Sequence, residues 1–325
     1  MTAIPSPFQG RCFPDPFPPA CASAWGDDPY GLWCEIEVGG VVQRLRWVEP
    51  GVFMMGSSEE ERGRVAGEIS EDFWKRHIGN EGPQHQVTLT RGFWLSDTAC
   101  TQALWLAVIG GENPSGFDGD LERPVDSVGW DDVNERFLPA LQQQLSRGIT
   151  AVLPTEAEWE YACRAGTKTA YSFGDRFDST QANVGSKGTM PVKAYPPNPW
   201  GFYQMHGNVY EWCSDVARPY GPGSVTDPDG GQNDGGRALR GGAWLGEPWR
   251  VRSATRDGLR CESRFDRVGF RFALRPIQDG AAGGMGRSEP VQILPPAEPG
   301  LRLDDATRPH PPSGRKPPKA AAKKR

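Results

Sequence analysis

The chain has 325 residues, of which 37% are hydrophobic and 24% charged, and its formal net charge is −5. These values are typical of a soluble globular protein, and they argue against a nucleic-acid partner, which needs a strongly basic face. No run of 18 apolar residues is present, and the N-terminus lacks the pattern of a signal peptide, so we expect no membrane span and a cytoplasmic protein.

The chain contains 41 Gly, 31 Pro and 12 Trp, a composition that favours turns and loops held by large aromatic side chains over long helices. Seven cysteines stand at positions 12, 21, 34, 100, 163, 213 and 261. They form no CxxC pair, so a structural zinc site is not expected. In a cytoplasmic protein we expect most of them to be reduced.

The N-terminal part of the chain reads as an arm, a hairpin and an insert. Residues 1–32 are rich in Pro and aromatic residues and are predicted to form an extended arm. Residues 33–55 alternate apolar and polar positions around Gly39-Gly40, which predicts a β-hairpin with a tight turn. Residues 57–84 are highly charged and are predicted to be a mobile insert. A strand with period-two alternation follows over 85–96.

Three helices are predicted in the middle of the chain. The first runs from 98 to 109 and the second from 131 to 146, and each is followed by a glycine stop. The third is marked by a capping box, in which Thr155 is the N-cap and Glu158 reaches back to its backbone. The chain after it is expected to be mostly loop, with short strands near 201–203, 238–241 and 269–274.

Residues 276–325 contain few large apolar residues and end in a run of Pro, Ala and Lys. This composition predicts a disordered tail. Its basic end would suit a weak contact with an acidic partner, and the alternative is a tail that is simply solvated.

Several segments together resemble one known family. In chain order they are GVFMMGS (51–57), VTLTRGFWLSDTACTQALW (87–105), RPVDSVGWDDV (123–133), LPTEAEWEYACRAG (153–166), NPWGFYQMHGNVYEWCSD (198–215), RALRGGAW (237–244), RVRSATR (250–256) and VGFRFAL (268–274). With them the chain resembles the formylglycine-generating enzyme, or sulfatase-modifying factor, family over residues 33–275. The resemblance implies a single α+β domain with the C-type-lectin-like fold and little regular secondary structure.

The resemblance leaves the activity open, because the family holds copper oxidases, iron-dependent domains and non-catalytic binders. The oxidases hold copper through a cysteine pair that follows a GG[ST][YW] turn, and soft thiolates are the ligands that select Cu(I). The equivalent span here, 245–251, contains no cysteine, and the four histidines at 77, 85, 206 and 310 form no evident iron set. We therefore expect no copper or iron and favour a non-catalytic protein. A metal-dependent copper or non-haem iron oxidase is the alternative.

The resemblance also implies structural calcium sites, whose ligands are carbonyl and carboxylate oxygens. Carried over onto this sequence, the ligands would be Asn183 and Val184 in one site, and Gly207, Val209 and Glu211 in a second. Gln204 stands where the family usually has Asp or Asn. The alternative is that Glu211 is hydrogen-bonded to loop amides.

The segment between 244 and 268 carries the functional prediction. Residues that match the family alternate there with residues that the scaffold does not require, and these are rich in Trp and Arg, the side chains most enriched in binding hot spots. The spacing resembles that of retroelement-diversified variable proteins. We predict a surface for a protein or peptide ligand, formed by Trp244, Leu245, Glu247, Trp249, Arg250, Asp257, Leu259, Arg260, Arg264, Phe265, Asp266 and Arg267. The alternative is that the arginines pair with acidic neighbours on a solvated surface.

Overall fold

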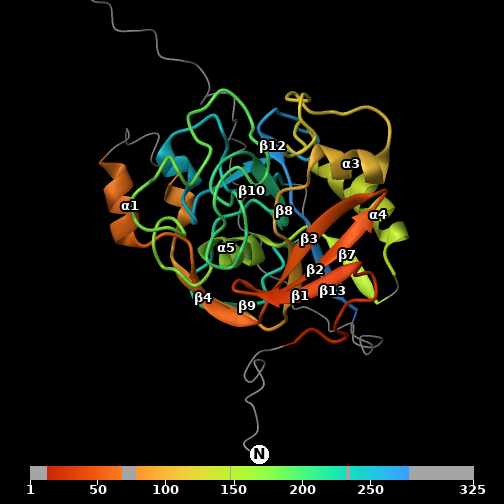
Figure 1. Ribbon diagram of the computed structural model, residues 1–325. Helices are drawn as coiled ribbons and strands as arrows, with labels where there is room; N and C mark the ends of the chain where they lie inside the picture. Colours follow the sequence, from red (N-terminus) through yellow and green to blue (C-terminus); the bar gives the residue numbers. More distant parts are fainter. Residues whose placement is uncertain (1–12, 68–77, 147, 232–234, 278–325) are drawn as a thin grey trace, which may run out of the picture.

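The computed structural model describes residues 13–67, 78–146, 148–231 and 235–277 (Figure 1). The largest sheet has six strands in the order β1-β2-β3-β6-β13-β7, and all neighbours are antiparallel. Its strands are β1 (Ala24–Asp28), β2 (Gly31–Val38), β3 (Val41–Val48), β6 (Phe93–Ser96), β7 (Ile149–Val152) and β13 (Ala273–Pro276). Strand β13 brings the end of the described chain into the middle of this sheet, so residues far apart in sequence share one core.

Two smaller sheets complete the strand layers. One has the order β11-β10-β8-β12 and comprises β8 (Tyr210–Val216), β10 (Arg237–Arg240), β11 (Arg256–Leu259) and β12 (Val268–Gly269). The other has the order β4-β5-β9 and comprises β4 (Gly51–Met55), β5 (His85–Leu89) and β9 (Val225–Thr226). Helices and strands are both present without βαβ alternation, so the architecture is α+β, as expected.

The helices are short, and α3, α4 and α5 pack on these sheets (Figure 1). Helix α3 (Gln102–Ile109) contacts β2 and β3, and helix α4 (Leu138–Gln144), which continues a π-helical turn η2 (Asp132–Phe137), contacts β7. Helix α5 (Glu156–Arg164) contacts β4 on one side and β8 and β10 on the other. It therefore joins the two smaller sheets. Among the described residues no helix is long and apolar enough to cross a membrane.

Local sequence signals explain several of these elements. Gly39 and Gly40 have φ angles of 56° and 81°, and they form the tight turn predicted between β2 and β3. In α5, the Oγ1 of Thr155 accepts the N–H of Glu158 at 3.1 Å, and the N–H of Thr155 donates to the Glu158 carboxylate at 2.7 Å. Both halves of the predicted capping box are thus formed. The helix predicted over 98–109 begins later, because Thr101 is its N-cap.

The core has two main parts. One lies between the six-stranded sheet and the helices α3 and α4, and contains Trp94, Phe137 and Phe272. The other surrounds α5 and contains Trp159 and Phe202. All five side chains have less than 2% of their surface exposed. At about 25 cal/mol per Å² of buried apolar area, these aromatic clusters supply much of the stabilisation that a loop-rich chain needs.

Several other expectations differ from the structure. The strand predicted over 85–96 is two strands, β5 and β6, which lie in different sheets. The predicted mobile insert, 57–84, contains helix α1 (Glu59–Ala66) and a 3₁₀ turn η1 (Gly79–Glu81), and both present buried residues. Strand β1 lies in the predicted arm and pairs with β2. No strand forms at 201–203. The predictions for residues 1–12, 68–77 and 278–325, including the basic tail, fall outside the described residues.

Candidate ligand-binding surface

Four buried arginines hold the 237–272 region to the rest of the domain, and we call them the arginine frame. They are Arg240, Arg252, Arg256 and Arg271. Each has a side chain no more than 3% exposed, and each is paired with a buried glutamate. Removing one partner of such a pair leaves a buried charge unpaired, at a cost of about 3–5 kcal/mol. The arginine frame therefore holds the backbone of this region against the rest of the domain.

Arg252 ties the region to the N-terminal half of the domain. Its guanidinium donates to Glu81 at 2.6 and 3.0 Å and to Glu61 at 2.7 Å, and its Nε–H donates to the backbone carbonyl of Trp249 at 2.9 Å. Burial raises the pKa of Glu61, even though the charge of Arg252 acts to lower it. The two glutamates come from α1 and η1, so the segment predicted as a mobile insert is a structural support of the candidate site.

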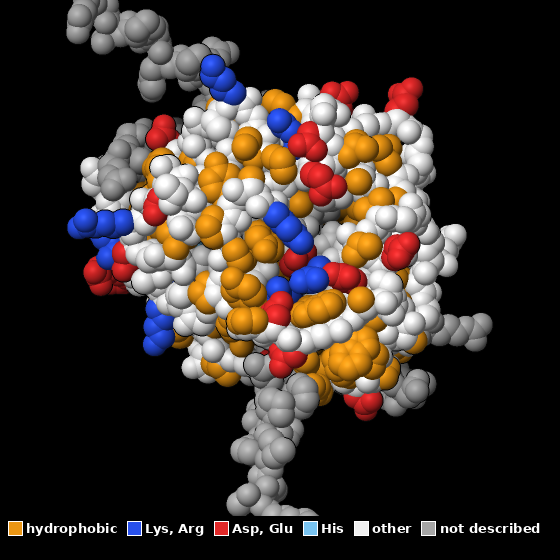
Figure 2. Space-filling model, in the orientation of Figure 1, with side chains coloured by type: hydrophobic (Ala, Val, Ile, Leu, Met, Phe, Trp, Pro, Cys, Tyr) orange, Lys and Arg blue, Asp and Glu red, His pale blue; other side chains and the backbone are white. Residues whose placement is uncertain are grey.

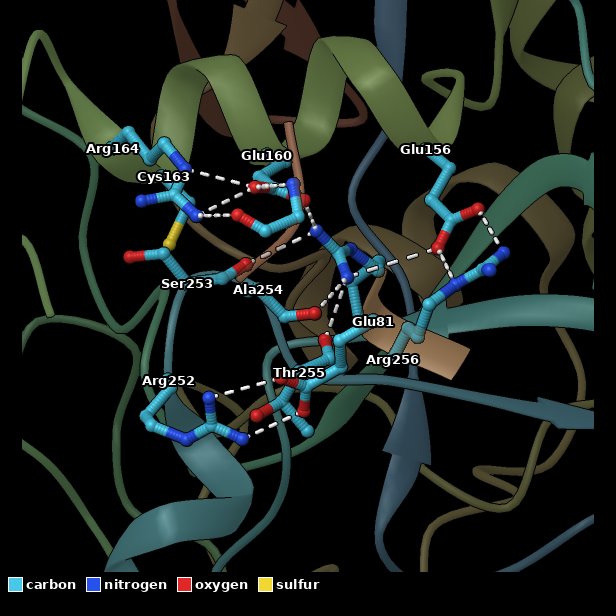
Figure 3. Close-up of polar contacts among 12 residues, drawn as sticks. Glu81, Glu156, Glu160, Cys163, Arg164, Arg252, Ser253, Ala254, Thr255 and Arg256 are labelled. Atoms are coloured by element: carbon cyan, nitrogen blue, oxygen red, sulfur yellow. Dashed lines mark hydrogen bonds and ion pairs between the residues drawn. The ribbon is translucent and has the colours of Figure 1, made fainter. Parts of the chain in front are cut away.

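Arg256 attaches the region to Glu156 of helix α5 (Figure 3), and Arg240 attaches it to Glu160 of the same helix. Arg256 forms a two-pronged pair with Glu156, with donor–acceptor distances of 2.7 and 2.6 Å. Arg240 pairs with Glu160 and also donates to the carbonyls of Ser253, Ala254 and Thr255. These three carbonyls belong to the loop that leads into β11, so the Arg240 guanidinium fixes its path.

The chemistry of Glu160 shows how the frame tolerates burial. Its carboxylate also accepts the N–H of Gly56 at 2.9 Å and the Nε–H of Arg164 at 2.8 Å. Burial acts to raise the pKa of Glu160, but the charges of Arg164 and Arg240 outweigh it, and the net pKa is lowered. The glutamate therefore stays ionised, which the two arginines require.

Arg271 forms an ion pair with Glu211, the carboxylate on which the second implied calcium site depends. It donates to Glu211 at 2.6 and 2.9 Å, and the Trp159 indole N–H donates to the same carboxylate at 2.6 Å. Glu211 is the one carboxylate in the two implied ligand sets, and its charge is already balanced by a guanidinium. The carbonyl of Asn183, in the first set, accepts the N–H of Asn208 at 3.0 Å. The Glu211 carboxylate would therefore be shared with Arg271, whereas the Asn183 side-chain oxygen is buried without a hydrogen-bond partner among the described residues, and calcium at these two sets stays a prediction.

The outward side of the region carries a group of accessible side chains, which we call the display surface. It comprises Leu245, Glu247, Arg250, Phe265 and Asp266, all exposed or half-buried. The display surface thus combines acidic, basic and apolar side chains, a mixture that Figure 2 also shows on one face of the domain. Mixed surfaces of this kind offer both charge complementarity and apolar contact to a partner.

Trp244 and Phe117 support the display surface at one edge. The Trp244 indole N–H donates to the backbone carbonyl of Asp266 at 3.2 Å, and its ring packs edge-on against Phe117, with 5.3 Å between the ring centroids. Trp244 is only 9% exposed. Of the predicted contact residues, this tryptophan therefore acts mainly by positioning Asp266 and Leu245.

Asp257 and Arg267 lie close enough to Arg250 to interact electrostatically. Both are buried, and burial raises the pKa of Asp257 to about 6, although the N–H of Gly258 and the charges of Arg250 and Arg267 act to lower it. The guanidinium of Arg267 also lies 4.6 Å from the centroid of the Phe265 ring. These contacts link Asp257 and Arg267 to Arg250 and Phe265 of the display surface.

Arg260 and Arg264 are exposed as well, and each pairs with an acidic residue. Arg264 donates to Asp132 at 2.7 Å and Arg260 to Glu262 at 2.6 Å, and their side chains are 48% and 83% exposed. For these two, the structure agrees with the alternative of ion pairs on a solvated surface. Such exposed pairs contribute about 0–1 kcal/mol each.

Two further predicted contact residues are buried in the domain. Trp249 is 8% exposed and forms a cluster with Val65 and Ile78, from the segment that precedes β5. Leu259 is 7% exposed and belongs to the main core. The prediction of contact residues is wrong for these two, because Trp and Leu are found in a core as well as in an interface and residue type alone does not distinguish them.

Sequence reasoning missed the supporting residues of the site. Glu61 and Glu81 lie in a segment whose high charge is typical of a solvated loop, and Phe117 lies outside any helix or strand. The signal that could have found the glutamates is the excess of arginines at matched family positions, since a buried arginine requires an acidic partner.

None of the described cysteines lies in the span where the oxidases carry their copper-binding pair. The described cysteines stand at 21, 34, 100, 163, 213 and 261, whereas that span is 245–251. Burial raises the pKa of the Cys163 thiol to about 12, which keeps it protonated. In the part of the chain that the structure describes, no group of three His, Cys, Asp or Glu side chains is placed to hold a metal ion. The residues present therefore do not fit the cysteine-bound copper of the oxidases.

Comparisons with known proteins agree with this fold. The chain is 34% identical to the formylglycine-generating enzyme of Streptomyces coelicolor over 224 residues, which cover 60% of this chain and 68% of that enzyme. It is 43% identical to the serine/threonine-protein kinase pkn1 of Chlamydia caviae over 117 residues, but these span only 34% of this chain and 18% of the kinase.

Among solved structures, Treponema denticola variable protein 1 superposes with a TM-score of 0.64 and 26% identity, over 75% of this chain and 99% of that one. These relationships confirm the C-type-lectin-like fold of the formylglycine-generating enzyme type. The sulfatase-modifying factor enzyme 1-like domain matches residues 40–276, and the chain therefore belongs to this family.

Proposed function

We propose that the protein recognises a protein or peptide ligand through the display surface. The observation that carries the proposal is that one segment combines buried side chains that hold its backbone with accessible side chains that can contact a ligand. The arginine frame is buried and ion-paired, whereas Leu245, Glu247 and Asp266 project from the same backbone. A rigid backbone with accessible side chains loses little conformational entropy when a ligand binds.

The chemistry of the display surface indicates the kind of ligand. Leu245 is 43% exposed and offers an apolar contact, and Arg250 and Asp266 offer charges of both signs. A polypeptide presents apolar and charged groups side by side, and so it suits this mixture. The similarity to a variable protein supports the same use of the fold, with exchangeable side chains on a constant scaffold.

A peptide library selected on the purified protein tests this proposal. We expect enriched sequences that protect residues 244–250 and 263–268 from hydrogen exchange when they bind. Protection confined to other elements, or no enrichment over an unrelated protein of similar charge, would contradict it.

An oxidase is the second candidate, and the relationship to the Streptomyces coelicolor enzyme is the observation that favours it. The lack of a thiol in the 245–251 span counts against the copper chemistry of that class. Elemental analysis of the purified protein separates the two candidates, because near-stoichiometric copper or iron would support the oxidase. The binding proposal requires neither metal.

A further inference from the structure

A cavity of about 280 Å³ opens on a different part of the domain from the display surface. Six of its lining residues are apolar, namely Phe173, Pro196, Pro197, Pro199, Phe202 and Met205. Ser172, Gln204 and His206 supply polar groups, and Gln181 and Tyr30 are more accessible lining residues. The volume is near the lower limit of small-molecule sites, and the mixture of apolar walls with a few polar groups is typical of them.

No Lys, Arg, Asp or Glu lines this cavity. Its histidine, His206, is 4% exposed, and burial lowers its pKa to about 4, so the imidazole is neutral near pH 7. A charged ligand would lose its hydration without meeting an opposite charge, which is costly. The cavity therefore selects against ions of either sign.

The hydrogen bonds of His206 fix its tautomer. Its Nδ1 lies 2.7 Å from the carbonyl oxygen of Val251, which can only accept, so Nδ1 carries the proton. Nε2 is then an acceptor, and it receives the N–H and the hydroxyl of Ser172 at 3.1 and 3.0 Å. The Ser172 hydroxyl is thus oriented, and its oxygen presents lone pairs to a hydrogen-bond donor.

The orientation of Gln204 is fixed as well. Asn208 accepts the N–H of Met190 at 2.8 Å and donates to the Met190 carbonyl at 3.0 Å, which sets its amide. Its Nδ2 then donates to the Gln204 Oε1 at 3.0 Å, and the Gln204 Nε2 has no hydrogen-bond partner among the described residues. Gln204 lines the cavity and is 7% exposed, so this side chain brings an unpartnered donor to the cavity. Buried donors without a partner are rare and unfavourable.

We propose that this cavity binds a small uncharged molecule with an apolar body and an amide-type head, which donates to the Ser172 oxygen and accepts from Gln204. Both an acceptor and a donor are needed in the head, and a neutral amide provides them. No residue of 244–268 lines the cavity, although the Val251 carbonyl of that segment holds His206 in place.

Three probes of the same size and shape test the charge selection. Benzamide, benzoate and benzylamine differ mainly in charge, and ligand-observed NMR titration of the full chain compares them. We expect benzamide to bind with a dissociation constant on the order of 1 mM, as for a fragment of this size. We expect benzoate and benzylamine to bind at least about tenfold more weakly. Equal binding of the three, or no binding of benzamide, would overturn the proposal.

Substitutions at Gln181 locate the binding, because its half-exposed position accepts a charge without disturbing the fold. Gln181→Glu should shift the preference towards benzylamine, and Gln181→Lys should shift it towards benzoate. Ser172→Ala should weaken benzamide about fivefold, the effect of one neutral hydrogen bond. If neither charge at position 181 changes the order of the three probes, the binding lies elsewhere and the assignment is wrong.

Discussion

The guanidinium of Arg252 donates to both carboxylate oxygens of Glu81, at 2.6 and 3.0 Å, although 171 positions separate the two residues. Glu81 is fully buried and Arg252 is 2% exposed. The pair joins the segment that carries the display surface to a segment whose composition suggested a mobile insert. The rigidity of the candidate site thus depends on residues that do not contact the proposed ligand.

Replacing Arg252 by Met tests this dependence. Glu61 and Glu81 would be left as buried charges without their partner, so we expect the free energy of unfolding in urea to fall by about 3–5 kcal/mol. The matched control is Arg260→Met, because the Arg260 side chain is 83% exposed and its loss should cost less than about 1 kcal/mol. Equal effects of the two substitutions would show that the buried pair does not hold the segment.

Trp249→Ala should destabilise the domain and should not act as a simple contact mutation. The side chain packs with Val65 and Ile78, and deleting a buried tryptophan costs about 3–5 kcal/mol. Thermal unfolding measures the effect. An unchanged melting temperature would mean that Trp249 lies on the surface and does not pack against Val65 of helix α1.

Asp215 should give the stability a distinctive pH dependence. Burial, and then the charge of Glu156, raises the pKa of Asp215 to about 7. A carboxyl whose folded pKa is raised contributes most to stability below the unfolded pKa of about 4, and this contribution is lost as the pH rises to about 7. Relative to the wild type, Asp215→Asn should therefore gain up to about 4 kcal/mol between pH 4 and pH 7. Denaturation across this range checks it, and a constant difference would refute the assigned pKa.

The stability of a Glu211→Gln variant distinguishes an ion pair from a calcium site. Glu211→Gln leaves Arg271 buried without a counter-charge, so we expect a loss of about 3–5 kcal/mol. The loss should be the same with a calcium chelator and with excess calcium. If instead the wild type loses stability on chelation and the variant does not, Glu211 is a calcium ligand.

The elements that were predicted correctly rest on local chemistry. The Thr155–Glu158 capping box and the Gly39-Gly40 turn each depend on residues within a few positions of one another, so their sequence is sufficient. The arginine frame depends on pairs separated by 60 to 191 positions, which a local pattern cannot reveal. Tryptophan is common in both cores and interfaces, so the residue type alone does not show that Trp249 is buried. Its packing against Val65 and Ile78, which are distant in sequence, shows that it belongs to the core.

The affinity of a selected peptide for matched variants tests the central claim, that the display surface and not the frame recognises the ligand. Calorimetric titration compares Leu245→Ser/Asp266→Ala with Val52→Ser, which removes a 57% exposed apolar side chain from β4 in another sheet. We expect the double variant to keep its melting temperature and to bind at least about tenfold more weakly, since hot-spot truncations cost about 2 kcal/mol or more. The Val52→Ser variant should bind like the wild type. Unchanged affinity in the double variant, or an equal loss in Val52→Ser, would contradict the account.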